Sequence, residues 1–301
     1  MPDGRFAPSP TAPLHLGNLR TALLAWLFAR SSGSRFLVRV EDLDPVASRE
    51  EHVVGHLADL AALGLEWDGP VVRQSDRRPQ HGAALEQLVA DGWTYPCFCS
   101  RKEIAEAVAA PHGEVEGGRY PGTCRHLSAA EQADRIAAGR RPALRLRADG
   151  IRVTAVDRLL GELDVEVDDF VVRRADGVPA YNLAVVVDDA DQGIGEVVRG
   201  DDLWPTTPRQ VHIAHLLGRP VPAYAHVPLV LGADGERLSK RHGSVTLAQR
   251  LAGGTDAVGV RSLLAASVGL CRPGDRPGLD DLLAGFDPAR LPRQSGVLPD
   301  L

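Results

Sequence analysis

Two short segments of this chain carry side chains suited to binding and transferring a phosphate group. In the first, a proline-rich loop at residues 8–14 runs into His15-Leu16-Gly17-Asn18. A helix that begins near His15 presents unpaired backbone N–H groups and the positive end of its dipole, which together suit a phosphate. Gly17 lets a flat nucleotide ring approach the backbone, and His15 can donate to a phosphate oxygen as charge develops. A capped helix with a surface histidine would give the same pattern.

The second segment reads Arg237-Leu238-Ser239-Lys240-Arg241 and follows glycines at positions 232 and 235. A lysine on a Gly-rich loop suits a phosphoryl group during transfer, because its ammonium offsets the developing negative charge. A solvated basic turn has the same composition. Taken together, the two segments predict a two-part nucleotide site.

Three of the four cysteines, Cys97, Cys99 and Cys124, lie near one another in the sequence, whereas Cys271 stands alone. In a cytoplasmic chain, clustered cysteines indicate a metal site before a disulfide. The surrounding chain is Gly-rich with few apolar residues, so a structural zinc ion would stabilise it. Unliganded buried thiols are the alternative, and Cys271 is expected to be a small core residue.

The elements that must position these residues follow a β–loop–α–β order. Apolar residues at helical spacing predict a helix from His15 to Gly33, and an apolar, β-branched run predicts a strand over 35–40. A second helix is expected over 48–63. This order is typical of an α/β fold, here a Rossmann-like, doubly wound parallel sheet.

Further along the chain, residues 151–175 are expected to form paired strands, and a helix is predicted over 208–217. The continuous apolar run at 183–187, followed by two aspartates, predicts a strand buried on both faces. Four parts are expected: the first half of a catalytic domain over 1–96, an inserted zinc-binding subdomain over 97–150, the second half with the second phosphate-binding segment over 151–243, and a short helical C-terminal extension over 244–301.

Composition sets limits on the function. The net charge of −6 does not by itself indicate a nucleic-acid-binding protein, and no signal peptide or bilayer-spanning run is visible, so a cytoplasmic protein is expected. A local arginine cluster could still contact RNA, or could form a solvated surface. Its members are Arg140, Arg141, Arg145, Arg147 and Arg152.

Read together, these segments resemble the class I aminoacyl-tRNA synthetases. Pro8-Ser9-Pro10-Thr11 with His15-Leu16-Gly17-Asn18 resembles their first signature, and Leu238-Ser239-Lys240 resembles the second. Runs at 5–11 and 40–44 narrow the likeness to the glutamyl branch, and runs at 74–75, 95–99, 120–125, 181–189 and 198–203 are similar to a shortened member of that branch. Asn18 stands where that family has histidine, Arg237 where lysine is usual, and Arg241 where serine is usual.

The resemblance implies roles for individual residues. His15 and Lys240 would stabilise charge in catalysis, with Mg²⁺ accompanying ATP. Glu41 would receive the ammonium group of glutamate, and arginine side chains its carboxylates. The implied ATP-binding residues are Pro8, His15, Gly17, Asn18, Arg237, Leu238, Ser239 and Lys240, and the implied glutamate-binding residues are Arg5, Phe6, Ala7, Pro8, Ser9, Glu41, Tyr181 and Arg199.

The same resemblance supplies a fourth zinc ligand beside Cys97, Cys99 and Cys124. In the family this ligand is a tyrosine, which is Tyr120 here. A phenol is an unusual ligand, but a nearby Zn²⁺ lowers its pKa. His126 or His112 could take its place.

The implied activity is the formation of glutamyl-adenylate from L-glutamate and ATP without tRNA, followed by transfer to an acceptor. Only 61 residues follow Lys240, fewer than a further anticodon-binding domain needs. The likeness is accordingly strongest to a shortened glutamyl branch that transfers glutamate to queuosine in the anticodon of tRNA(Asp), and that is monomeric. The alternatives are an unusually short enzyme that charges the 3′ end of tRNA(Glu), and a catalytically silent tRNA-binding paralogue.

Overall fold

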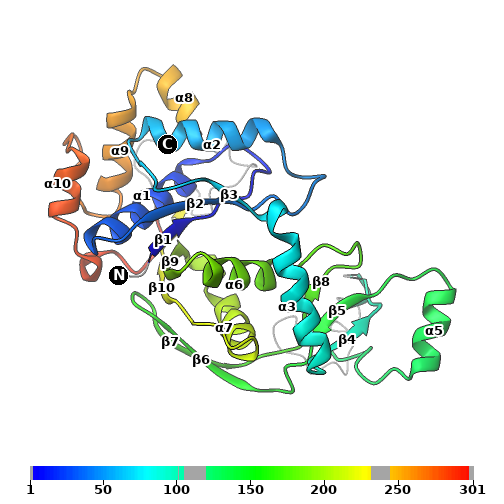
Figure 1. The fold of residues 1–301 in the computed structure, drawn as a ribbon. Helices are drawn as coiled ribbons and strands as arrows, with labels where there is room; N and C mark the ends of the chain where they lie inside the picture. The colour runs from blue at the N-terminus through cyan, green and yellow to red at the C-terminus, as the bar shows by residue number, and fades with distance from the viewer. Residues whose placement is uncertain (1–2, 101, 105–119, 232–244, 298–301) are drawn as a thin grey trace.

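The computed structural model describes residues 3–100, 102–104, 120–231 and 245–297. A seven-stranded sheet lies at its centre (Figure 1), in the order β3-β2-β1-β9-β10-β6-β7. Neighbouring strands are parallel except in the β6–β7 hairpin. The strands are β1 (Asp3–Phe6), β2 (Phe36–Val40), β3 (Val72–Arg73), β6 (Arg152–Asp157), β7 (Gly161–Glu166), β9 (Ile194–Gly200) and β10 (Ala223–Val227). The predicted Rossmann-like sheet is confirmed.

Helices cover both faces of this sheet and bury a separate hydrophobic core on each (Figure 1). Val198 of β9 packs in the core of α1, whereas Val197 packs in the core of α6 and α7, because successive strand side chains point to opposite faces. Helix α1 spans Leu16–Ser31, close to its predicted bounds. The other helices of the catalytic part are α2 (Glu50–Ala62), α3 (Arg78–Ala90), α6 (Tyr181–Asp191) and α7 (Thr207–Leu216), with short 3₁₀ helices at Gln74–Arg77 and Asp201–Thr206.

The predicted strand at 183–189 is wrong, because these residues form most of α6. Leu183, Ala184, Val185, Val186 and Val187 are all buried, so the helix is enclosed by the core around most of its circumference. A continuous apolar run marks complete burial but does not distinguish a strand from a buried helix.

A smaller antiparallel sheet lies beside the main one. It consists of β4 (Thr94–Cys97), β5 (Ala143–Leu146) and β8 (Phe170–Arg173), and helix α5 (Ala129–Ala137) belongs to the same region. This sheet therefore takes strands from both sides of the predicted 97–150 insertion. The paired strands expected over 151–175 include the β6–β7 hairpin, which joins the main sheet through β10.

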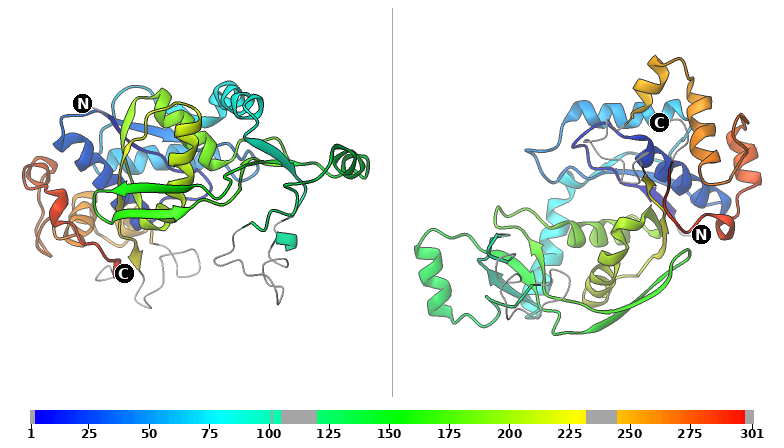
Figure 2. Two further views of the ribbon diagram at one scale, coloured as in Figure 1. Left: turned by 90° about the horizontal axis from the view of Figure 1, so that it is seen from below. Right: turned by 180° about the vertical axis from the view of Figure 1, so that it is seen from behind.

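The C-terminal part packs on α1, at the end of the molecule opposite α5 (Figure 2). It consists of short helices, as expected: α8 (Leu247–Ala252), α9 (Ala257–Ala266), α10 (Leu279–Ala284) and a 3₁₀ turn at Pro288–Arg290. Strand β11 (Val230–Leu231) pairs in parallel with β12 (Gly296–Val297). Within the described part of the chain, none of the helices combines the length and apolar character needed to cross a bilayer.

Candidate active site

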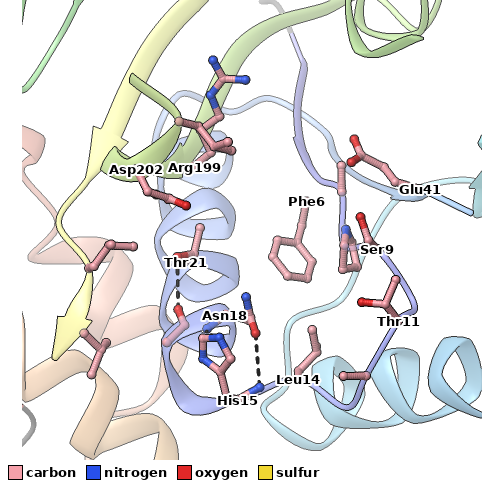
Figure 3. A pocket seen from close by; sticks show the side chains of 18 of the residues that line it. Phe6, Ser9, Thr11, Leu14, His15, Asn18, Thr21, Glu41, Arg199 and Asp202 are labelled. Atoms are coloured by element: carbon pink, nitrogen blue, oxygen red, sulfur yellow. Dashed lines mark hydrogen bonds between the residues drawn. The ribbon is translucent and has the colours of Figure 1, made fainter. Parts of the chain in front are cut away.

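A cavity of about 670 Å³ opens where β1 and β9 end, at the N-terminus of α1 (Figure 3). From β1 the chain continues through α1 to β2, and from β9 it continues through α7 to β10 on the other side. Open parallel sheets bind ligands at such a switch point. The cavity is lined by the predicted glutamate-binding residues Phe6, Ala7, Pro8, Ser9, Glu41, Tyr181 and Arg199, and by the predicted ATP-binding residues Pro8, His15, Gly17 and Asn18.

His15 is the N-cap of α1 and lines the cavity. Its Nδ1 accepts a hydrogen bond from the Asn18 backbone N–H at 3.3 Å, and Asn18 Oδ1 accepts one from the His15 N–H at 3.2 Å (Figure 3). Because Nδ1 accepts, the proton of the neutral imidazole lies on Nε2. The reciprocal cap thus fixes an N–H donor at a helix N-terminus, where a phosphate is favoured.

A side chain at position 17 would displace this imidazole. A Cβ built on Gly17 lies 2.9 Å from His15 Cε1 and 3.0 Å from His15 Nδ1. Glycine at position 17 therefore preserves the orientation of the His15 ring. This is a second reason for glycine here, besides the close approach of a ligand to the backbone.

Glu41, just after β2, is one of two acidic residues that line the cavity; the other is Asp202, near Arg199 in Figure 3. The Glu41 side chain is 9% exposed, and its Oε1 lies 3.6 Å from Arg39 Nη2. Burial raises the pKa of Glu41, although Arg39 and Arg5 act in the opposite direction. An ammonium group bound beside Glu41 would favour the carboxylate form, so this position suits the amino group of an amino acid.

Arg5 is the one predicted glutamate-binding residue that does not line the cavity. Its Nε and Nη2 contact the two carboxylate oxygens of Asp189 at 3.1 and 3.3 Å, and Arg39 Nη1 contacts the same carboxylate at 2.7 Å. Burial opposes ionisation of Asp189, but Arg39 and Arg5 outweigh it and lower its pKa. The carboxylate of Asp189 therefore offsets the positive charge of Arg5 inside the protein.

Arg199, at the end of β9, has a different set of partners. Its Nε donates to His226 Nε2 at 2.9 Å, and its Nη2 donates to Thr207 Oγ1 at 2.8 Å. Its Nη1 donates to Gln210 Oε1 at 2.8 Å and lies 3.4 Å from Tyr181 Oη. Among ion pairs between described residues, none involves Arg199, although the residue is only 5% exposed. A buried positive charge therefore lies beside the cavity with uncharged partners.

Sequence reasoning missed the buried polar residues that hold these two arginines. Asp189, which also pairs with Arg39, holds Arg5, and His226, Thr207 and Gln210 hold Arg199. A signal for two of them was available. In the buried strands β2 and β10, Arg39 and His226 are basic residues in otherwise mainly apolar runs, and a buried polar group needs a partner.

The second predicted phosphate-binding segment, Arg237, Leu238, Ser239, Lys240 and Arg241, lies outside the described residues. The described chain on either side of it reaches the first segment. Val230 lines the cavity, and the Leu16 N–H donates to the Val245 carbonyl at 3.0 Å.

The three clustered cysteines come together beside the small sheet. The sulfur atoms of Cys97, Cys99 and Cys124 lie within 4.8 Å of one another, with 3.5 Å between Cys99 and Cys124. Burial opposes ionisation of Cys97, but hydrogen bonding and the Arg145 guanidinium outweigh it and lower its pKa. Burial raises the pKa of Cys99 to about 11. This arrangement could hold a metal ion.

Tyr120 completes a fourth corner of this cluster. Its Oη lies 3.4 Å from Cys97 Sγ and 3.6 Å from Cys99 Sγ. The Arg145 guanidinium lies 3.6 Å from the centroid of the Tyr120 ring. Burial and the hydrogen bond with Cys97 raise the pKa of Tyr120, so the phenol keeps its proton unless a metal ion binds beside it. Of the two predicted substitutes, His112 lies outside the described residues and His126 is not part of the cluster.

The arginine cluster is largely engaged within the fold. Arg145 donates to the Asp169 carbonyl, and Arg147 lies 4.8 Å from the centroid of the Tyr95 ring. Arg140 and Arg152 pair with Glu103 and Asp164. These four side chains therefore have structural contacts that the sequence pattern did not reveal.

Comparison with known proteins agrees with this geometry. Residues 3–265 match the family of class I tRNA synthetases (E and Q), catalytic domain. Glutamyl-Q tRNA(Asp) synthetase of Nocardia farcinica is 59% identical to the chain, with 99% of this chain and 93% of that protein aligned. The protein of that name from Symbiobacterium thermophilum is 47% identical over 98% of this chain and 95% of its own length.

A solved structure shows the same architecture. The glutamate tRNA ligase of Elizabethkingia meningosepticum, in complex with its amino acid, superposes with a TM-score of 0.83 at 25% identity. The match covers 98% of this chain and 66% of the ligase.

Proposed function

Because the chain belongs to the class I tRNA synthetases of the glutamate and glutamine family, we propose that it activates L-glutamate with ATP and transfers the glutamate to queuosine in the anticodon of tRNA(Asp). Relatives that carry the name glutamyl-Q tRNA(Asp) synthetase align over nearly the whole chain and support this acceptor. The observation that carries the proposal is a single cavity with Glu41 on one side, Arg199 on the other, and the N-terminus of α1 beside them (Figure 3).

The charges of this cavity fit glutamate. Glu41 would receive the ammonium group, and Arg199, with Tyr181 beside it, would receive the side-chain carboxylate. Phe6, Ala7, Pro8 and Ser9 also line the cavity. Arg5 would act on this site mainly through its charge, because its guanidinium is held by Asp189.

Two steps follow from this placement. An oxygen of the α-carboxylate attacks the α-phosphorus of ATP, and the bond to the leaving pyrophosphate breaks, which gives glutamyl-adenylate. His15 and Lys240 would stabilise the added negative charge, and Mg²⁺ enters with ATP. A queuosine hydroxyl then attacks the acyl carbonyl carbon, AMP leaves, and the hydroxyl proton passes to the released phosphate or to water. Positioning and electrostatics suffice, so no protein nucleophile is required.

Glutamate-dependent exchange of pyrophosphate into ATP tests the first step. We expect exchange without added tRNA, and its absence would favour a catalytically silent paralogue. Labelled glutamate offered with tRNA(Asp) then tests the acceptor, with and without queuosine in the anticodon. Incorporation only into the queuosine-containing tRNA supports the proposal, whereas equal incorporation into both contradicts it.

The second candidate, charging of tRNA(Glu), is favoured by a relative named glutamate–tRNA ligase 1 from Halorhodospira halophila, which is 43% identical over 95% of this chain. Nuclease mapping of the labelled tRNA separates the two candidates. A labelled 3′-terminal adenosine would establish this second activity, and a labelled anticodon fragment would exclude it.

We also propose that Cys97, Cys99, Cys124 and Tyr120 hold a structural zinc ion, because three thiols and a phenol at these separations fit its tetrahedral donor set. Bound zinc would neutralise ionised thiols and join β4 to the segment that contains Tyr120 and Cys124. We expect about one zinc ion per chain, and a melting temperature that falls when a chelator removes it. Cys124→Ser should lose the metal. Cys271→Ser, which changes the cysteine outside the cluster, should retain it; loss in both variants would contradict the assignment.

A further inference from the structure

His226 is a fully buried histidine that is in register with Arg199 on the neighbouring strand. β10 and β9 are parallel, and their Cα pairing places His226 directly beside Arg199. Side chains paired in this way project from the same face of a sheet. Here the pairing brings His226 Nε2 to 2.9 Å from Arg199 Nε.

Asp157 fixes the other edge of the imidazole. Its Oδ2 lies 2.6 Å from His226 Nδ1 and accepts the His226 backbone N–H at 2.8 Å. Its Oδ1 accepts the backbone N–H groups of Leu159 and Leu160 at 2.8 and 2.9 Å. The carboxylate is therefore held by four hydrogen bonds from three residues, and the imidazole has little freedom to turn.

These contacts specify one protonation state. A guanidinium donates only, so His226 Nε2 must accept and cannot carry a proton. Nδ1 then carries the proton and donates it to Asp157. In this state His226 adds no charge beside Arg199, whose guanidinium keeps its full charge for an anionic group in the cavity.

Building on the proposed function, we propose that Asp157 and His226 are a positioning pair that orients Arg199 toward the side-chain carboxylate of glutamate. Neither member touches the reacting atoms or lines the cavity. The pair makes the selection of a carboxylate over a neutral carboxamide depend on an unprotonated His226 Nε2.

A pH dependence follows. The charged or titratable groups around His226 are Asp157 on β6, Arg199 on β9, Tyr224 on β10 and Arg5 on β1. Burial lowers the pKa of His226, and the two arginines lower it as well, whereas Asp157 raises it. The net result is a pKa below the ordinary histidine value. Protonation at low pH would place an N–H of the imidazolium against the Arg199 guanidinium. Glutamate use should therefore decline only below the ordinary histidine pKa of about 6.5.

Three variants test the pair in the pyrophosphate exchange assay. His226→Leu removes the acceptor and should raise the KM for glutamate at least about tenfold, with the KM for ATP within about twofold of wild type. His226→Gln places a carboxamide oxygen near the Nε2 position and should stay within about threefold of wild type. His212→Leu is the matched control, because His212 is also buried, at 3% exposed, and its Nε2 has no hydrogen-bond partner among the described residues; its KM for glutamate should not change.

The pH profile separates positioning from packing. In His226→Gln the acid limb of kcat/KM for glutamate should lie at lower pH than in wild type, because Glu41 and the substrate carboxylates still titrate there but residue 226 does not. The acid limb should also move to lower pH in Asp157→Asn, because the anion that favours the imidazolium is gone. An acid limb at the same pH in His226→Gln as in wild type would overturn the proposal, as would an equal rise of both KM values in His226→Leu. If the leucine variant does not fold, the glutamine variant and this profile decide.

A readout without turnover distinguishes this inference from the proposed function. Nitrogen NMR of the folded protein at neutral pH should show His226 with its proton on Nδ1, whereas an Nε2–H tautomer or an imidazolium would overturn the pair. Absence of glutamate-dependent exchange in the wild type would instead contradict the proposed function. Exchange in wild type with an unchanged KM in His226→Leu would contradict only the positioning pair.

Discussion

Arg5 and Arg199 are two buried arginines on neighbouring strands of one sheet, yet the fold treats their charges differently. Arg5 meets a carboxylate, Asp189, through two hydrogen bonds. Arg199 meets an imidazole, a hydroxyl, an amide oxygen and a phenol. Arg199 also lines the cavity, and Arg5 does not.

The difference indicates what each charge is for. A buried cation is costly unless a carboxylate or an equivalent group offsets it. For Arg5 the offset comes from the fold, so its loss should act mainly on stability. For Arg199 the hydrogen-bond partners are uncharged and the residue lines the cavity, so we expect an anionic ligand to offset its charge and its loss to act mainly on binding.

The sharpest test replaces Arg199 with methionine, which keeps most of the aliphatic stem. We expect kcat/KM for glutamate to fall about 10³-fold, near 4 kcal/mol, because a desolvated carboxylate would lose its charged partner. Steady-state pyrophosphate exchange measures this. Arg158→Met is the control, since Arg158 is 55% exposed and pairs with Glu196 away from the cavity. Unchanged glutamate kinetics in Arg199→Met would contradict the assignment of its charge to the substrate.

The second test replaces Arg5 with methionine. We expect the free energy of unfolding to fall by about 3 kcal/mol, because Asp189 keeps only Arg39 as a cationic partner. Urea denaturation measures the loss. Adding Asp189→Asn should recover part of it by removing the undercompensated carboxylate. If Arg5→Met is as stable as wild type but loses glutamate activity as fully as Arg199→Met, then Arg5 contacts the substrate and the comparison fails.

The contrast between the two arginines also shows what the sequence could predict. The order of strand, loop and helix, the start of a helix near His15 and the cysteine cluster follow from local patterns, and the structure contains all three. The run at 183–187 was assigned to a strand, but it forms a helix. A run in which every residue is apolar shows neither the alternation of a strand nor the spacing of a helix. Arg5 and Arg199 were assigned one role, since only the fold brings Asp189 to one and His226 to the other. Arg5 and Asp189 are separated by 184 positions in the sequence, and Arg199 and His226 by 27. Contacts between residues so far apart leave no local pattern in the sequence.

The third test asks whether the two ends of the cavity are independent. Gly17→Ala should push the His15 ring from its cap, because the new Cβ would lie 2.9 Å from Cε1. We expect kcat for exchange to fall about tenfold, near 1.4 kcal/mol, with the KM for glutamate within about twofold of wild type. Gly55→Ala in α2 is the control, since nothing lies within 4 Å of its Cβ position. A large rise in the KM for glutamate would show that the two ends are coupled.

The smallest expected effect concerns the weakest partner of Arg199. Tyr181 Oη lies 3.4 Å from Nη1, longer than the contacts from Gln210 and Thr207, so Tyr181→Phe removes a marginal hydrogen bond and no charge. We expect the KM for glutamate to rise about threefold, less than 1 kcal/mol, with the free energy of unfolding unchanged. Titration of glutamate in the exchange assay measures the change. A rise of more than about thirtyfold would mean that the Tyr181 phenol itself binds the side-chain carboxylate of glutamate. The positive charge of Arg199 would then account for only part of the recognition of that carboxylate.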